Sequence, residues 1–268
     1  MSNMIGTSLI EALVQSVALS HLIAGRDRAG LLLLAAPESG KTTIACAASA
    51  KHVTAISVIT GRSVLQEIAN DDIEFLLFND MAAIRSLSKP TTALLITLLN
   101  QLTNGEKGIA SFAGKDRIEI TRAIGVIGCL PFSIFADQRA KWREMGFISR
   151  MIPFAYSYNA ELVATIKNSI DKHNPVKAAP RKMPAFTHTA PVSVAMPRAS
   201  HVSAVRALAD ARATSLGQIG IRLLKNYHVL IRAHALLHKR RRVTDVDVEF
   251  LRRVDSFVSI KDCKPLTP

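Results

Sequence analysis

Three consecutive residues, Gly40, Lys41 and Thr42, have the types and the order that bind a chain of phosphates. Glycine lets the backbone approach a phosphate closely, because it has no side chain to keep the two apart. The lysine neutralises charge on the outer phosphates, and the threonine hydroxyl is a ligand for Mg²⁺. The segment fits the phosphate-loop pattern G-x-x-x-x-G-K-[ST] except at its first position, where Ala35 replaces glycine.

The residues on either side of this motif predict the strand and the helix that a phosphate loop requires. An apolar run at 31–35 is typical of a buried strand, and the small residues at 42–50 favour a helix. Backbone N–H groups of the loop and the positive end of the helix would face the phosphates. A chance Gly-Lys-Thr would need neither element, so we interpret the segment as a nucleotide-binding loop. Its predicted contact residues are Ala36, Pro37, Glu38, Ser39, Gly40, Lys41, Thr42 and Thr43.

A second candidate site follows another apolar strand, predicted at 73–78 and ending in Asn79 and Asp80. Such a strand directs a carboxylate from the carboxyl edge of the sheet towards a metal ion, so we predict Thr42 and Asp80 as ligands of Mg²⁺. Two alignments are open. In one, Asn79 takes the metal position and Asp80 the catalytic position; in the other, Asp80 takes the metal and Met81 stands in the catalytic position. A turn that only ends the strand is the alternative. We favour the metal site and expect it on the strand adjacent to that of the loop.

Composition narrows the class of protein. The chain has 268 residues, a formal net charge of +13 and a pI of about 10.1, which favours a polyanion as partner. Three isolated cysteines, Cys46, Cys129 and Cys263, argue against a zinc site or a disulfide framework and fit a reducing compartment. No apolar run reaches the roughly 18 residues that span a bilayer, and the start lacks a signal-peptide pattern. We therefore expect a cytoplasmic protein that does not enter the membrane.

Strands and helices alternate through the first part of the chain, which predicts an α/β fold with a parallel sheet. Besides the elements above, we expect strands at 52–60, 124–130 and 154–158 and helices at 8–24, 63–70, 89–103, 132–143 and 160–171. We expect 104–119 to be a hairpin or a loop with short strands. Prolines punctuate the segment that follows, and 202–256 is helical in pattern without a strand signal. The predicted organisation is a P-loop core at 1–172, a linker or extended segment at 173–201, and a helical domain at 202–268.

Taken together, these motifs resemble those of an AAA+ ATPase, in particular the branch of the minichromosome-maintenance helicases and the MoxR-type chaperones. The segment 147–151 is similar to the part of that family that carries the arginine finger, and residues 220–226, 231–237 and 243–248 are similar to its lid helices. The resemblance implies a parallel-sheet core with a C-terminal all-α lid, and ATP with Mg²⁺ as ligands. It also implies that Arg150 reaches the site of a neighbouring subunit, and that Arg222 serves as sensor 2 in its own subunit.

Hydrolysis needs a second cation besides Lys41, because negative charge builds up on the outer phosphoryl group during its transfer. Each arginine has an ordinary alternative as a solvated or ion-paired surface residue. Lys225 and Arg232 lie near Arg222 and are weaker candidates for the same role.

Other positions depart from the family pattern. The strand at 124–130 ends around Cys129 without the Asn or Thr that would hold the attacking water, and Cys129 reads as a small core residue. With Asn79 and Ala35, this departure favours nucleotide binding over rapid turnover. The basic run at 238–242 is either a solvated turn or a contact for DNA phosphates, and Thr244 or Asp245 is expected to cap a last helix.

The leading hypothesis is an AAA+ ATPase that hydrolyses ATP slowly in a ring or filament of identical subunits and remodels DNA or a DNA-bound protein. One alternative is a nucleotide-gated adaptor with little hydrolysis, motivated by Asn79, Cys129 and Ala35. Another is a MoxR-like chaperone that acts on protein, in which the positive charge is a surface property only.

Overall fold

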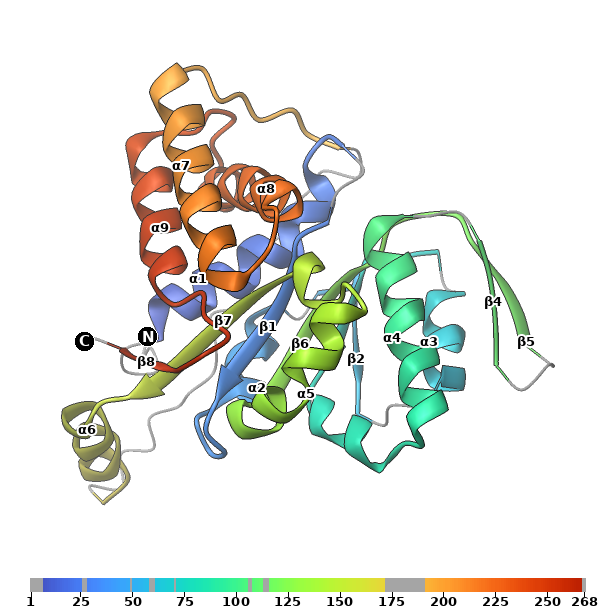
Figure 1. Ribbon diagram of the computed structural model, residues 1–268. Helices are drawn as coiled ribbons and strands as arrows, with labels where there is room; N and C mark the ends of the chain where they lie inside the picture. The colour runs from blue at the N-terminus through green and yellow to red at the C-terminus, as the bar shows by residue number, and fades with distance from the viewer. Residues whose placement is uncertain are drawn as a thin grey trace.

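A computed structural model describes residues 7–25, 28–48, 50–57, 61–69, 71–105, 108–112, 116–171 and 191–266. Within these residues, six strands form one parallel sheet in the order β2-β3-β6-β1-β7-β8 (Figure 1). The predicted α/β fold with a parallel sheet is therefore confirmed. The strands of this sheet are β1 (Gly30–Ala35), β2 (Val53–Ile56), β3 (Phe75–Phe78), β6 (Gly125–Pro131), β7 (Met151–Tyr158) and β8 (Lys264–Leu266).

Strand β6 lies between β1 and β3 and pairs with both, through Leu31 with Ile127 and Phe75 with Gly125. The expectation that Asp80 follows the strand adjacent to β1 is therefore wrong. Side-chain volume permits this order. A Cβ on Gly125 would overlap the ring of Phe75, the residue with which Gly125 pairs on β3, so the glycine lets β6 lie directly beside β3.

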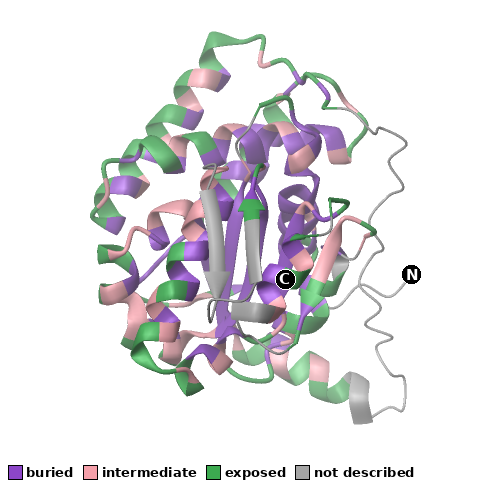
Figure 2. Ribbon diagram, turned by 90° about the vertical axis from the view of Figure 1, so that its right-hand side faces the viewer, coloured by how far each residue is buried: buried purple, intermediate pink, exposed green. Residues whose placement is uncertain are grey.

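Helices flank the sheet and bury its central strands on both faces, as the purple core of Figure 2 shows. The expected helices are confirmed, although the one after the loop is shorter than predicted. The α-helices in the described part of the chain are α1 (Ser8–Leu19), α2 (Lys41–Ala45), α3 (Gly61–Ile68), α4 (Lys89–Asn104), α5 (Phe132–Glu144), α6 (Ala160–Asp171), α7 (Ala199–Leu216), α8 (Ile221–Leu237) and α9 (Asp245–Ser256). No helix in the described part of the chain is both long and apolar enough to cross a membrane.

The C-terminal helices form a layer together with α1, which packs against α8 and α9 (Figure 1). Helix α1 comes from the segment assigned to the core by sequence, so the helical layer draws on both ends of the chain. Of the expected linker at 173–201, residues 173–190 lie outside the described residues. Residues 191–198 are extended, with bridges from Val192 to Ile23 and from Ala195 to Arg242, and the last three residues already belong to α7.

Two smaller features complete the fold. The hairpin expected at 104–119 is present as β4 (Gly108–Phe112) and β5 (Asp116–Ile120), and it projects away from the main sheet (Figure 1). After α9 the chain returns along β7, where Val258 bridges Phe154 and β8 pairs with the carboxyl end of β7. The sequence predicted no strand here, because three residues have too little pattern to indicate one.

Candidate functional site

The loop between β1 and α2 turns sharply before the helix begins. Gly40 adopts a left-handed conformation, with φ of 70° and ψ of 14°, and it precedes the first residue of α2. Glu38 also has a positive φ of 61°, which is uncommon for a residue with a side chain. Both residues turn the chain sharply, so that the backbone N–H groups entering α2 are gathered at the carboxyl edge of β1.

The Lys41 side chain folds back over this loop. Its ammonium donates to the carbonyl oxygens of Ala35 at 3.2 Å and Ala36 at 2.6 Å, and to the Ser39 hydroxyl at 3.1 Å. Burial lowers the pKa of Lys41, and its electrostatic interactions with nearby Cys129 and Asp80 offset this effect only in part. A buried ammonium held only by uncharged oxygens gains when an anion replaces them, so the surroundings of Lys41 favour an anion.

Two tyrosines hold the loop from the side. The hydroxyls of Tyr156 and Tyr158 both donate to the carbonyl oxygen of Ser39, at 3.2 and 2.8 Å. Burial raises the pKa of both phenols, so they remain donors. Sequence reasoning missed them. The available signal was their spacing, because residues two apart at the end of a strand lie on the same face.

The end of β3 lies against the loop although β6 separates the two strands. The hydroxyl of Thr42 donates to the carbonyl oxygen of Asn79 at 3.1 Å. The side-chain oxygen of Asn79 is buried, and among the described residues it has no hydrogen-bond partner. The Asp80 carboxylate is exposed and accepts from the N–H of Ala82 at 2.8 Å, capping the 3₁₀ turn Met81–Ser86. Asp80 thus ends the strand with a turn and also stands beside the loop.

These residues fit a magnesium ion. The described residues contain no cluster of three or more His, Cys, Asp or Glu side chains that could hold a metal. Magnesium on a nucleotide does not need one, because it takes one or two protein oxygens and completes its shell with phosphates and water. The Thr42 hydroxyl, the unpartnered oxygen of Asn79 and the Asp80 carboxylate supply oxygens of this kind.

Two thiols flank the lysine. Cys129, at the end of β6, is almost fully buried, and burial raises its pKa to about 12. Cys263, just before β8, donates to the carbonyl oxygen of Leu34 at 3.9 Å, and burial raises its pKa to about 11. Both thiols are therefore neutral and poor at orienting a water molecule. The sequence placed Cys129 correctly in the core, but it did not predict that Cys263 lies beside the end of β1.

Arg150 lies at the opposite edge of the sheet from the loop. It immediately precedes β7, whose first residue Met151 is aligned with Gly30 at the start of β1. Because the strands are parallel, Arg150 is at their amino ends and the loop is at their carboxyl ends. Its guanidinium donates to the side-chain oxygen of Asn104 at 3.0 Å and to the carbonyl oxygen of Gly146 at 2.6 Å.

Arg222 lies beside Arg150 and not beside the loop of its own chain. It donates to the Ser149 hydroxyl at 3.2 Å. The cause is the packing of α8, which lies against α1 and against the turn that carries Ser149 and Arg150. The geometry does not bring Arg222 to the position in its own subunit that the family resemblance implies.

Both arginines line one cavity of about 270 Å³ at this edge. The side chains around it are polar or positively charged, and none is acidic: Arg28, Thr103, Asn104, Arg150, Arg222, Lys225 and Asn226. Arg28 donates to Glu74 at 3.2 Å, while two of its nitrogens, Nε and Nη1, are buried and unpaired within the described residues. We call this the cation cavity. Four positive side chains around one hollow favour an anion.

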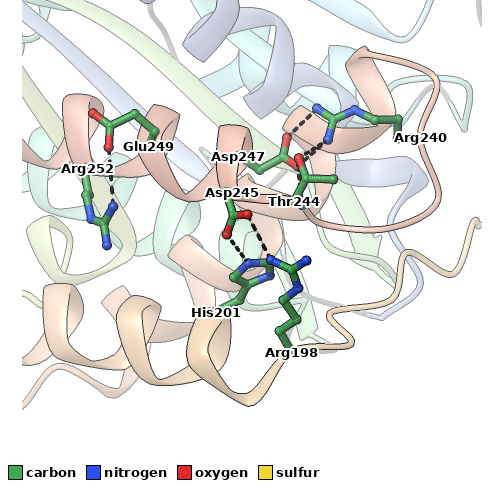
Figure 3. A network of polar contacts seen from close by, with 8 residues as sticks. All are labelled: Arg198, His201, Arg240, Thr244, Asp245, Asp247, Glu249 and Arg252. Carbon is green, nitrogen blue, oxygen red and sulfur yellow. Dashed lines mark hydrogen bonds and ion pairs between the residues drawn. The ribbon is translucent and has the colours of Figure 1, made fainter.

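The basic run at 238–242 is divided between structure and surface. Arg240 turns inward and donates to both carboxylate oxygens of the buried Asp247 and to the Thr244 hydroxyl (Figure 3). Thr244 caps α9 together with Asp247, which confirms one of the two expected caps. Arg241 and Arg242 remain exposed. Arg240 is thus used in hydrogen bonds within the protein, and only the exposed residues of the run are available to contact DNA phosphates.

No protein-family model matches this chain, and a search of curated proteins finds no significant match to it.

Proposed function

We propose that this protein binds ATP with Mg²⁺ in the loop formed by residues 36–43 and hydrolyses it slowly within an assembly of identical subunits. The observation that carries the proposal is the arrangement at the carboxyl edge of the sheet. A buried lysine held by neutral oxygens, a threonine hydroxyl at the start of α2, and the end of a second strand meet at one place.

Each residue of the site has a separate role. Lys41 exchanges its carbonyl partners for the outer phosphates, and the backbone N–H groups after Gly40 donate to the same phosphates. Thr42 and the end of β3 hold the magnesium ion, which neutralises charge on the phosphate oxygens when it is bound. Asp80 is the exposed carboxylate closest along the chain to this contact, and it is the candidate to orient the attacking water.

Slow hydrolysis follows from two side chains. Asn79 is neutral where a carboxylate would bind the metal more strongly, and Cys129 is a neutral, buried thiol at the end of β6. Neither group can accept a proton from water at neutral pH. The carboxylate of Asp80 is therefore the one acidic side chain that we assign to the reaction.

The arginines support an assembly. Charge that develops on the outer phosphate needs a cation besides Lys41. Arg150 and Arg222 lie at the far edge of their own sheet, so neither serves the loop of the same chain. A head-to-tail contact would bring the cation cavity of one subunit to the loaded loop of the next, and such contacts generate rings or filaments. The parallel sheet and the C-terminal helical layer support the AAA+ proposal at the level of architecture.

Binding and turnover of ATP test this function. A fluorescent ATP analogue measures affinity and phosphate release measures hydrolysis, for the wild type, Lys41→Ala, Asp80→Ala and Arg150→Ala. We expect Lys41→Ala to lose binding. Asp80→Ala and Arg150→Ala should bind the analogue and release phosphate at least about tenfold more slowly than wild type. A wild type that does not bind the analogue in the presence of Mg²⁺ would refute the proposal.

A nucleotide-gated adaptor is the second candidate, and the neutral Asn79 and Cys129 favour it. It predicts tight binding of the analogue with no phosphate release above that of the Lys41→Ala variant. The partner is DNA, a DNA-bound protein or, in the chaperone alternative, another protein. Binding to DNA that weakens steeply with salt would favour the first, because released counterions dominate such contacts.

A further inference from the structure

Another hollow lies between the 3₁₀ turn Met81–Ser86 and the helices α4 and α5. Both helices and the turn pack against β6, and the helices lie side by side on one face of the sheet (Figure 1). The hollow has a volume of about 420 Å³, and pockets that hold small molecules range from about 300 to 1,000 Å³. Its described lining residues all lie outside the phosphate loop and the cation cavity. We call it the α4–α5 pocket.

One face of α5 forms a wall of this pocket. Five side chains at helical spacing contribute to it: Ile134, Asp137, Gln138, Lys141 and Trp142. Residues three and four positions apart share one face of a helix, so these side chains form a single stripe. The stripe combines apolar groups with charged ones, which is the lining that a molecule with an apolar part and a charged part requires.

The floor of the pocket is apolar. Met81, Ile84 and Trp142 are buried, and Leu87 and Ile134 are half-buried against the same core. The indole nitrogen of Trp142 is buried, and among the described residues it has no hydrogen-bond partner. A buried donor without a partner is costly, so an occupant that carries an acceptor atom is favoured.

The rim of the pocket is positively charged. Arg85, Lys89 and Lys141 contribute cations, and Asp137 is the one acid among the described lining residues. Arg85 approaches Asp137 at 4.0 Å, but their side chains are 57% and 60% exposed, so water weakens this pair. Within the described residues, neither lysine has a carboxylate partner. The rim therefore attracts an anion and disfavours a cation.

We propose that the α4–α5 pocket binds a small organic molecule with an apolar body and a carboxylate. The apolar body covers the floor, and the carboxylate supplies acceptor oxygens for the ammonium groups of the rim and for the indole N–H. An inorganic anion would leave the floor uncovered, and a neutral apolar molecule would leave the cations unpaired. Asp80 caps the turn but does not line the pocket, and the ligand needs no nucleotide, so the inference is independent of the proposed function.

A fluorescence titration of the full chain without nucleotide tests this inference, because Trp142 is the single tryptophan of the chain and lines the pocket. The probe is octanoate. Octanol and octylammonium are the comparison compounds, since they carry a neutral and a positive group on the same apolar chain. We expect octanoate to change the emission of Trp142 saturably, octanol to bind at least about tenfold more weakly, and octylammonium to bind more weakly still.

Variants separate the rim from the floor. Lys89→Ala combined with Lys141→Ala removes two cations and keeps the apolar floor, so octanoate should bind at least about tenfold more weakly and octanol as before. Lys167→Ala is the matched control and should bind octanoate as wild type does, because Lys167 is an exposed lysine of α6 outside the pocket. Ile134→Asp places a carboxylate in the wall and should abolish octanoate binding, with circular dichroism at 222 nm to verify that the helices remain.

Three results would each overturn the inference. They are an emission of Trp142 that octanoate leaves unchanged up to millimolar concentration, octanol that binds as tightly as octanoate, and a double lysine variant that keeps wild-type affinity for octanoate. The lysine variant decides the question if Ile134→Asp does not fold. Binding of a fluorescent ATP analogue tests the proposed function separately, so failure of either proposal leaves the other standing.

Discussion

Two aspartates on α9 provide a test of how the C-terminal helical layer is held together. Asp245 and Asp247 are two residues apart, and both accept hydrogen bonds from basic side chains (Figure 3). The side chain of Asp245 is 78% exposed, whereas that of Asp247 is 0% exposed. The same substitution, Asp to Asn, therefore removes a charge from water in one case and from the protein interior in the other.

Asp247 joins three elements. It accepts from Nδ1 of His234 at 2.7 Å, from both terminal nitrogens of Arg240 at 2.6 and 2.8 Å, and from the N–H of Thr244 at 2.8 Å. An asparagine would turn an N–H₂ group towards donors and leave Arg240 without its counter-charge. Removing one partner of a buried pair costs about 3–5 kcal/mol, which is a large part of the roughly 5–15 kcal/mol that stabilises a domain.

Urea unfolding measures this cost. With a slope of about 3 kcal/mol per molar urea, the expected loss moves the midpoint of Asp247→Asn down by about 1–1.7 M. Circular dichroism at 222 nm reports on the helices, and the fluorescence of Trp142, the single tryptophan, reports on the sheet domain. Asp245→Asn is the matched control, and we expect its midpoint to stay close to that of wild type, because solvent screens the pair.

The pH dependence of the stability also depends on the hydrogen bonds of Asp247. Burial by itself raises the pKa of Asp247, but hydrogen bonds from His234, Arg240 and Thr244 outweigh it and hold the pKa well below its usual range. A depressed folded-state pKa stabilises the protein above the unfolded-state value of about 3.9, and this contribution is lost as the pH falls below it.

An equal shift of the urea midpoint by Asp247→Asn and Asp245→Asn at pH 7 would refute the argument that the buried ion pair of Asp247 stabilises the helical layer more than the exposed pair of Asp245.

Three further predictions concern the loop and the first helix. Because burial lowers the pKa of Lys41, affinity for a fluorescent ATP analogue should fall as the pH rises towards 10, before an ordinary lysine would lose its proton; constant affinity up to pH 10 would count against a direct phosphate contact. Tyr158→Phe removes a donor to Ser39 and should cost about 1 kcal/mol of stability in urea unfolding and weaken binding of the analogue, with Tyr156 still in place. Burial, with the neighbouring charge of His52, lowers the pKa of His21 to about 4. Wild type should therefore lose up to about 1.4 kcal/mol per pH unit between pH 6.5 and 4, and a His21→Phe variant that loses as much would contradict this.

The local pattern of apolar and polar residues predicted most of the helices and strands. The boundaries of α4, α5 and α6 agree with their expected positions within one or two residues, because apolar spacing and capping residues act over a few positions. The strand at 31–35 is continuous in apolar residues since both of its faces are covered. Helix α2 ends earlier than expected, and the chain continues as a 3₁₀ turn at Cys46–Ala48.

The candidate site was predicted in part. Lys41, Thr42 and Asn79 come together as their order along the chain implied, because the ends of parallel strands meet at one edge. Tyr158 and Cys263 could not be placed, since their contacts, with Ser39 in the loop and with Leu34 in β1, join residues more than a hundred positions apart. The periodicity of apolar residues along the chain indicates local secondary structure and does not predict a contact between distant residues.

What the sequence by itself determined is the chemistry available to this protein: a lysine and a hydroxyl after a buried strand, an acid after another, and arginines in two later segments. Which of these groups share a site was decided only by the tertiary structure. Strand β6 lies between β1 and β3, where Gly125 leaves room for the ring of Phe75, and the packing of α8 on α1 carries Arg222 to Arg150 at the far edge of the sheet. Residue types are local information, whereas the edge at which a side chain emerges depends on strand order and helix packing, and these are set by volumes and contacts between distant parts of the chain.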